Sequence, residues 1–228
     1  MIPLPWSRSR KPGLVLAALA LGLWLAPGAQ AAVVLASRGA VQLERAGQAV
    51  TIVPELAFEE GDELSVSADA ELVLRLDDGA RLAVRPDSRV LFKRLGKGNS
   101  PEQRQKLLKI FKGGVRYISG QAPRKSRIAF ETPSATIGIR GTDLEIAVTG
   151  DSAAAAPRGT YLKVNTGLAV LVALDGTELE LAPGQIAFGS EPELTPRGVR
   201  ALRQPAGRRV EAAPPDVFKA GTLDSLLR

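Results

Sequence analysis

Short runs in which apolar and polar residues alternate make up most of the chain between residues 33 and 188. In the run 71–76, Leu72, Leu74 and Leu76 fall on one side of an extended chain and charged residues on the other. The same alternation recurs, between turn-forming Gly, Asp and Pro residues, at Leu64/Val66, Leu82/Val84, Val90/Phe92, Ile128/Phe130, Ile137/Ile139, Leu144/Ile146/Val148, Leu162/Val164, Val170/Val172, Leu179/Leu181 and Ile186/Phe188. Successive short strands of this kind predict an all-β fold, either sandwich-like or solenoid-like.

One stretch before Gly113 fits two patterns. Residues 100–103 have the form of a capping box with Pro at the first helical position, and Gly113 could end such a helix. The alternation of apolar and polar residues over 106–111, followed by two glycines, is instead typical of a hairpin strand. We predict a loop or helical turn at 99–104 and a strand at 106–111, with a helix over 100–112 as the alternative.

The first 31 residues have the form of an export signal. Three basic residues precede the uncharged run Leu14–Leu25, which is shorter than the roughly 20 residues that span a bilayer. Ala29-Gln30-Ala31 then matches the small-x-small cleavage pattern. We predict a Sec-type leader cleaved after Ala31 and a periplasmic mature chain. The alternative is a retained leader, which would be the chain's only contact with a membrane.

The remaining chain divides into a predicted β domain at residues 32–190 and a C-terminal arm at 191–228. The arm is rich in Pro and Arg up to residue 215, which is typical of a linker or a loosely docked segment. Its end carries the apolar residues Val217, Phe218, Leu223, Leu226 and Leu227. We expect this end to pack back on the same chain, with contact to a partner as the alternative.

Composition narrows the function. The chain has neither Cys nor His, which excludes disulfides, thiolate or imidazole catalysis and metal sites built on these ligands. Its formal net charge is +6, but three of the basic residues belong to the predicted leader and the β domain is nearly neutral. Such a domain lacks the charge pattern of a nucleic-acid binder. We therefore expect no enzyme activity, cofactor, metal or nucleic-acid partner.

Carboxylates do not change that expectation. Asp62, Asp78 and Asp175 each lie beside a glycine in a predicted turn, where the side chain is expected to accept a hydrogen bond from the backbone. Calcium coordination would need several such oxygens to converge. A hydrolase built on carboxylates alone is a third hypothesis, which requires two acids to meet in a cleft.

The densest motif spans residues 132–146. Thr132-Pro133 predicts an extended or turn entry, because the residue before a proline is held out of the helical region. Gly138 is interpreted as a position where a neighbouring strand comes close, and Gly141 as one that needs a positive φ. Its glycines do not form a phosphate loop, because the Gly-Lys-Ser/Thr ending is missing.

Arg140 is the candidate binding residue in this motif. Beside Thr142 and Asp143 it could form a bidentate pair that joins two strands. It could instead bind an anionic or carboxylate ligand. A single arginine is a weak signal for a ligand, so the structural pair is the favoured interpretation.

These residues resemble the FecR domain, a periplasmic module of iron-uptake sigma regulators and of many exported proteins. The uninterrupted block Thr132–Thr142 carries the resemblance: a Thr-Pro, a small residue and a Thr, two spaced aliphatics, and Arg-Gly-Thr. The flanking turns that match in order are Arg38–Val41, Gly61–Leu64, Leu76–Gly79, Pro86–Ser88, Lys163–Val170 and Ala182–Gln185. The resemblance covers about residues 36 to 190 and implies an all-β stack of short strands, with Thr132, Pro133, Gly138, Arg140, Gly141 and Thr142 as structural residues.

In the sigma-regulator branch the resemblance implies a role in receiving a signal from an outer-membrane transporter. A spanning helix and a cytoplasmic anti-sigma segment pass that signal inward. We expect this chain to lack both and to be a stand-alone exported protein. The leading hypothesis is a non-enzymatic periplasmic protein that binds an envelope protein partner in signalling or assembly. The alternative is a module that binds cell-wall glycan or another envelope polymer.

Overall fold

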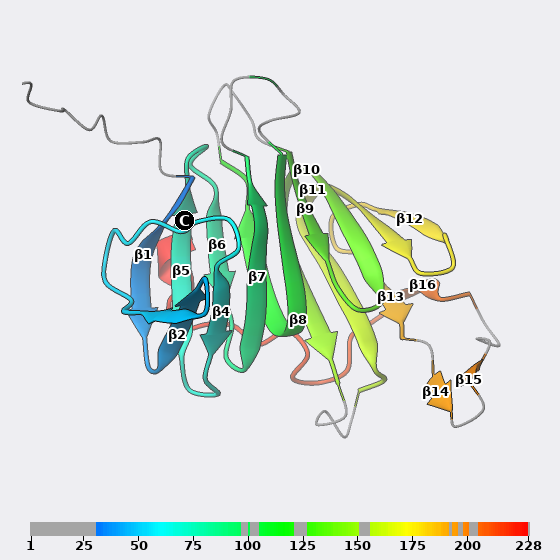
Figure 1. The fold of residues 1–228 in the computed structure, drawn as a ribbon. Helices are drawn as coiled ribbons and strands as arrows, with labels where there is room; N and C mark the ends of the chain where they lie inside the picture. Colours follow the sequence, from blue (N-terminus) through cyan, green and yellow to red (C-terminus); the bar gives the residue numbers. More distant parts are fainter. Residues whose placement is uncertain are drawn as a thin grey trace, which may run out of the picture.

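The computed structural model describes residues 31–96, 100, 105–120, 127–150, 156–191, 193–195, 198–200 and 205–227. Fourteen strands form one continuous sheet, and β14 and β15 form a separate pair (Figure 1). The elements are β1 (Ala32–Arg38), β2 (Val41–Arg45), β3 (Gln48–Val50), β4 (Glu63–Val66), β5 (Glu71–Leu76), β6 (Arg81–Val84), β7 (Ser88–Leu95), β8 (Gln105–Ile118), β9 (Arg127–Glu131), β10 (Ala135–Thr149), β11 (Gly159–Ala173), β12 (Glu178–Leu181), β13 (Ile186–Ser190), β14 (Glu193–Thr195), β15 (Gly198–Arg200), β16 (Gly207–Val210) and the 3₁₀ helix η1 (Asp224–Leu227).

The all-β prediction is confirmed. The described part of the chain holds no α-helix, and its strand pairings are antiparallel except for β8 with β9. The strand predicted at 106–111 lies within β8, so the alternative helix over 100–112 is wrong. The alternation of buried and half-buried residues along β8 explains this, because a period of two fits a strand. Of the predicted loop at 99–104, only Ser100 lies within the described residues.

The sheet folds into two layers because three long strands belong to both. The first half of β8 pairs with β7 and β9, and its second half pairs with β6 and β10. Strand β10 begins beside β9 and ends beside β8, while β11 begins beside β13 and ends beside β12. The first layer therefore runs β3-β2-β4-β7-β8-β9-β10-β11-β12, and the second runs β1-β5-β6-β8-β10-β11-β13-β16 (Figure 1). This is the sandwich-like alternative, with the two layers joined through shared strands.

One hydrophobic core lies between the layers. It combines residues of the first layer, such as Leu64 and Phe92, with residues of the second, such as Leu72 and Leu82. Each of these four side chains is at most 1% exposed. The period-two alternation places every second residue of a strand in this core.

Strands β10 and β11 change layers together. Their pairing shifts register between Arg140 and Asp143, with Gly141 at the bend and Gly167 beside it on β11. Gly141 has a φ of 62° and Gly167 a φ of 78°. Side chains rarely adopt such angles, so the predicted positive φ at Gly141 is confirmed.

The C-terminal segment packs on the outer face of the second layer. Strand β16 extends that layer beside β13, and residues 211–227 continue across it. Leu227 is 3% exposed and packs with Val73 and Ala83. The apolar end thus lies on its own chain, as its composition led us to expect.

Polar contacts hold the same segment in place. The Glu71 carboxylate accepts hydrogen bonds from the backbone N–H of Thr222 and Leu223 and from the Thr222 hydroxyl, each with a donor–acceptor distance of 3.0 Å. Asp224 accepts two hydrogen bonds from the Arg85 guanidinium, at 2.5 and 3.1 Å.

The predicted leader, residues 1–31, lies outside the described residues except for Ala31, which is 1% exposed and belongs to the core. Within the parts of the chain that the structure describes, no helix has the length and hydropathy of a membrane span.

Candidate functional site

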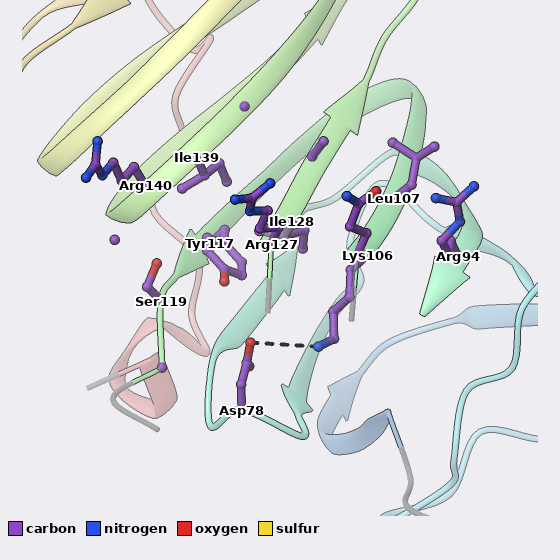
Figure 2. A pocket seen from close by; sticks show the side chains of 15 residues that line it. Asp78, Arg94, Lys106, Leu107, Tyr117, Ser119, Arg127, Ile128, Ile139 and Arg140 are labelled. Carbon is purple, nitrogen blue, oxygen red and sulfur yellow. Dashed lines mark ion pairs between the residues drawn. The ribbon is translucent and has the colours of Figure 1, made fainter. Parts of the chain in front are cut away.

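A groove of about 790 Å³ opens where β10 turns from one layer into the other. Its lining comes from both ends of β8, the start of β9, the bend of β10, the β5–β6 turn and the end of β7. Figure 2 shows four cationic side chains along it, Arg94, Lys106, Arg127 and Arg140. We refer to this feature as the basic groove.

The strand register places three small or apolar residues side by side in the groove. Leu107 of β8 is opposite Ala129 of β9, and Ala129 is opposite Gly138 of β10. All three line the groove and are partly exposed on the outer face of the first layer. They form its floor, which is shallow because Ala and Gly carry little or no side chain.

Arginines stand next to this floor. Arg127 lies two residues before Ala129 and Arg140 two residues after Gly138, so each shares the outer face with its neighbour. Arg94 is opposite Leu107. All three arginines are exposed, and none has an acidic partner among the residues that the structure describes. They therefore give the groove an uncompensated positive charge.

Lys106 differs from these arginines because it is buried and paired. Its side chain is fully buried, with Nζ 2.6 Å from Oδ1 of Asp77 and 3.7 Å from Oδ2 of Asp78 (Figure 2). A buried lysine that is held by carboxylates is a structural ion pair rather than a free binding group. The β5–β6 turn is thereby fastened to the start of β8.

Tyr117 forms the inner wall and remains a neutral phenol. It is 2% exposed and packs edge-on against Phe130, with ring centroids 5.8 Å apart. Burial and the nearby Asp78 carboxylate raise the pKa of Tyr117 well above its usual range, although a hydrogen bond with Ser119 opposes this. Tyr117 therefore cannot act as a general base in the groove.

The Thr-Pro turn of the motif has a structural role. The Thr132 hydroxyl donates to the carbonyl of Ala135 and accepts from its N–H, both at 2.9 Å. The Thr160 hydroxyl donates to Thr132 at 2.7 Å, which leaves the Ser134 hydroxyl to donate to Thr160, also at 2.7 Å. Thr132, Ser134 and Thr160 are buried, and Pro133 lies exposed in the turn.

Thr142, at the other end of the motif, fastens the bend of β10. Its backbone N–H donates to the Ser119 hydroxyl at 2.8 Å, and its own hydroxyl donates to the Leu168 carbonyl at 2.9 Å. The bend is therefore tied to β8 on one side and to β11 on the other.

Two sequence interpretations are wrong. The bidentate partner of Asp143 is Arg116 of β8, with Nε–Oδ1 and Nη2–Oδ2 distances of 3.1 and 2.8 Å, and Arg140 lines the groove instead. The bend between Arg140 and Asp143 separates these two sequence neighbours. At Gly138 no strand packs over the position of a side chain, because a Cβ built there would meet no heavy atom of the described residues within 4 Å.

The turn aspartates behave as expected. Asp62 accepts from the N–H of Glu59 at 2.8 Å, Asp78 from Ala80 at 3.1 Å and Asp175 from Thr177 at 3.0 Å. Across the described residues, no three or more acidic side chains gather in a way that could hold a metal ion.

Sequence reasoning missed most of the site. It named Arg140 and Gly138, but not Arg94, Arg127 or Tyr117. These residues come from four strands, and no local motif connects them. They come together because the four strands that carry them are neighbours in the folded sheet.

The residues that line the groove lie in a part of the chain that is similar to a known family. Residues 62–169 match the family model described as FecR protein. Two crystal structures, at 1.65 and 2.50 Å resolution, of "a putative anti-sigma factor from Parabacteroides distasonis ATCC 8503" each share 13% sequence identity and a TM-score of 0.45 with this chain. Each match covers 63% of this chain and 60% of that protein, so the chain spans less than two thirds of its length. No curated protein matches the chain. The residues that match this model, 62–169, include all four groove cations.

Proposed function

We propose that this chain is an exported, non-enzymatic protein whose FecR domain binds a protein partner in the cell envelope through the basic groove. The observation that carries the proposal is the set of exposed arginines, Arg94, Arg127 and Arg140, which have no acidic partner among the described residues. Exposed charges of one sign that converge on a groove attract a partner of the opposite sign and orient it.

The chemistry of the lining supports binding rather than catalysis. Lys106 is held in a buried ion pair, and burial keeps Tyr117 protonated. The whole sequence has no His or Cys to act as base or nucleophile. The arginines that remain offer planar guanidinium groups, which suit the binding of carboxylates.

Export and leader removal form part of the proposal. The basic start, the short apolar run Leu14–Leu25 and the Ala29-Gln30-Ala31 pattern support it. Intact-mass measurement of the protein recovered from the periplasm of an expressing bacterium should give a chain that begins at Ala32. A chain that begins at Met1 would instead support the retained leader.

The binding proposal is tested by chemical cross-linking and affinity capture in the native envelope. The mature protein should retain a specific partner that the double variant R127E/R140E loses. A matched variant, K112E/K219E, makes the same change in charge at exposed lysines outside the groove and should retain the partner. Loss in both variants, or in neither, would contradict a role for the groove.

A second binding assay distinguishes the envelope-polymer alternative from the protein-binding proposal. Saturable binding to purified peptidoglycan that depends on Arg127 and Arg140, together with no captured protein, would favour an envelope-polymer module over a protein-binding one.

A further inference from the structure

Gly138 is a residue that the fold does not require to be glycine. It lies inside β10 with an ordinary extended backbone, and a Cβ there would meet no heavy atom within 4 Å. Glycine in a strand interior destabilises a protein relative to alanine, because its backbone loses more conformational freedom on folding. A strand glycine without a packing reason marks a place where a ligand or another backbone comes close.

The neighbours of Gly138 extend this open position into a track. Gly138 is opposite Ala129 on one side and Val170 on the other. Leu107 continues the row beyond Ala129. The row crosses four strands on the outer face of the first layer, and it is low in the middle and apolar throughout.

The separation of the outer arginines along this track matches the length of four residues in an extended peptide. Arg94 is on β7 and Arg140 is on β10, three strand spacings away, which is about 14 Å. Four residues of an extended chain cover about 13–14 Å and bring residues i and i+4 to the same side. Arg127 lies between these two arginines (Figure 2).

We infer that the basic groove binds an extended acidic peptide segment whose main chain lies over Gly138 and Ala129. Carboxylates on alternate residues of that segment pair with Arg94, Arg127 and Arg140. This inference rests on the proposed protein-binding function and names the chemistry of the partner. Guanidinium–carboxylate pairs supply the specificity, and the small floor residues allow the close approach of a backbone.

A carbohydrate ligand fits the described lining less well. Tyr117 is the one aromatic residue in that lining, and at 2% exposure it presents no ring on which a sugar could stack. The side chains of Leu107 and Val170, at the two ends of the track, suit the apolar portions of a peptide instead.

The experiment measures binding of the mature protein to a fluorescein-labelled eight-residue peptide in which glutamate alternates with threonine. Fluorescence anisotropy should show saturable binding. Replacing each glutamate by glutamine, or introducing R127Q/R140Q, should weaken the affinity by about tenfold or more. The G138V variant should do the same by filling the floor.

Matched controls show whether a loss of affinity comes from this site, from the overall charge of the protein or from damage to the fold. Thr136 lies on the same face of β10 as Gly138. Lys112 is an exposed cation on β8 that does not line the basic groove. The T136V and K112Q variants should change the affinity by less than about twofold. Because the space at Gly138 is open, G138V should unfold at an unchanged or higher denaturant concentration.

Besides a failure of the acidic peptide to bind, two outcomes would overturn the inference. The first is that G138V binds the peptide as tightly as the wild type. The second is that K112Q and R127Q/R140Q lose the same amount of affinity for the peptide. If the envelope capture succeeds while the acidic peptide does not bind, the partner chemistry is wrong and the proposed function stands. If the peptide binds while no envelope protein is captured, the proposed function fails and the acidic-peptide site stands.

Discussion

The carbonyl oxygen of Gly141 faces Gly167 so closely that a Cβ on Gly167 would lie 2.0 Å from it. The two residues lie on adjacent strands at the point where both turn from one layer into the other. No side chain fits between the two backbones there. This contact sets the path of β10, and thereby the position of Arg140 in the basic groove.

The Gly167→Ala substitution should destabilise the protein by about 3 kcal/mol or more, because it adds a steric clash to an unfavourable positive φ. Gly176→Ala is the matched control, since its φ is 82° and its surroundings are open. That variant should lose only about 1–2 kcal/mol. Urea denaturation followed by circular dichroism measures both. Equal losses would show that the close approach to Gly141 contributes nothing.

Arg116, rather than Arg140, should stabilise the fold. Replacing Arg116 by Gln breaks its bidentate pair with Asp143 and should lower the free energy of unfolding by about 1–3 kcal/mol. Replacing Arg140 by Gln should change it by less than about 0.5 kcal/mol, because that side chain is exposed and has no acidic partner among the described residues. The opposite ranking in thermal or urea denaturation would restore Arg140 as the structural residue.

The third prediction concerns the buried hydroxyl cluster of Thr132, Ser134 and Thr160. Thr160→Val keeps the shape of the side chain but removes the hydroxyl that accepts from Ser134 and donates to Thr132. Leaving these buried groups without a partner should destabilise the protein by about 1–3 kcal/mol. The exposed Thr136→Val substitution on β10 is the control and should be close to neutral. A neutral Thr160→Val would mean that the cluster does not stabilise the turn.

The C-terminal segment should loosen in acid. Burial opposes ionisation of Asp224, but its pairing with Arg85, the Gly221 N–H and the nearby Arg116 together lower its pKa below the usual carboxyl range. The folded state therefore holds this proton more weakly than the unfolded chain. The stabilisation is complete above the ordinary aspartate pKa of about 3.9 and is lost as the pH falls through the lower folded-state value.

Denaturation midpoints of the wild type and Asp224→Asn from pH 6 to pH 2 test this. The variant should be less stable at pH 6, and the difference should shrink as the pH falls below about 4. Asp216→Asn, which changes an 80% exposed side chain in the same segment, should match the wild type throughout. A constant difference between the wild type and Asp224→Asn across this range would exclude the ionised carboxylate as its source.

Local pattern predicted strands β4 to β13 but identified no run for β1–β3 or β14–β16. The alternation in the run 106–111 competed with a capping-box signal and predicted the strand correctly, because burial of every second side chain outweighs a local helix start. The pattern could not show that β8 pairs with different strands in its two halves. Pairing partners depend on contacts between residues far apart in the chain.

The same limit explains the errors at the site. Asp143 and Arg140 are three residues apart, and proximity in sequence suggested a pair that the bend at Gly141 prevents. Arg116 reaches Asp143 from another strand, at a separation of 27 residues. Gly138 was interpreted as a packing glycine, since a sequence does not show whether the space beside a residue is filled or open.

The sequence by itself determined the β class of the fold, the strands between residues 63 and 190, the positive φ at Gly141 and the lack of thiolate or imidazole chemistry. Alternation, turn residues and composition are local properties, so they can be read along the chain. The tertiary structure alone decided which charges are paired and which are exposed. Arg116 pairs with Asp143, while Arg94, Arg127 and Arg140 lie exposed at one groove, because strands from distant parts of the chain meet there.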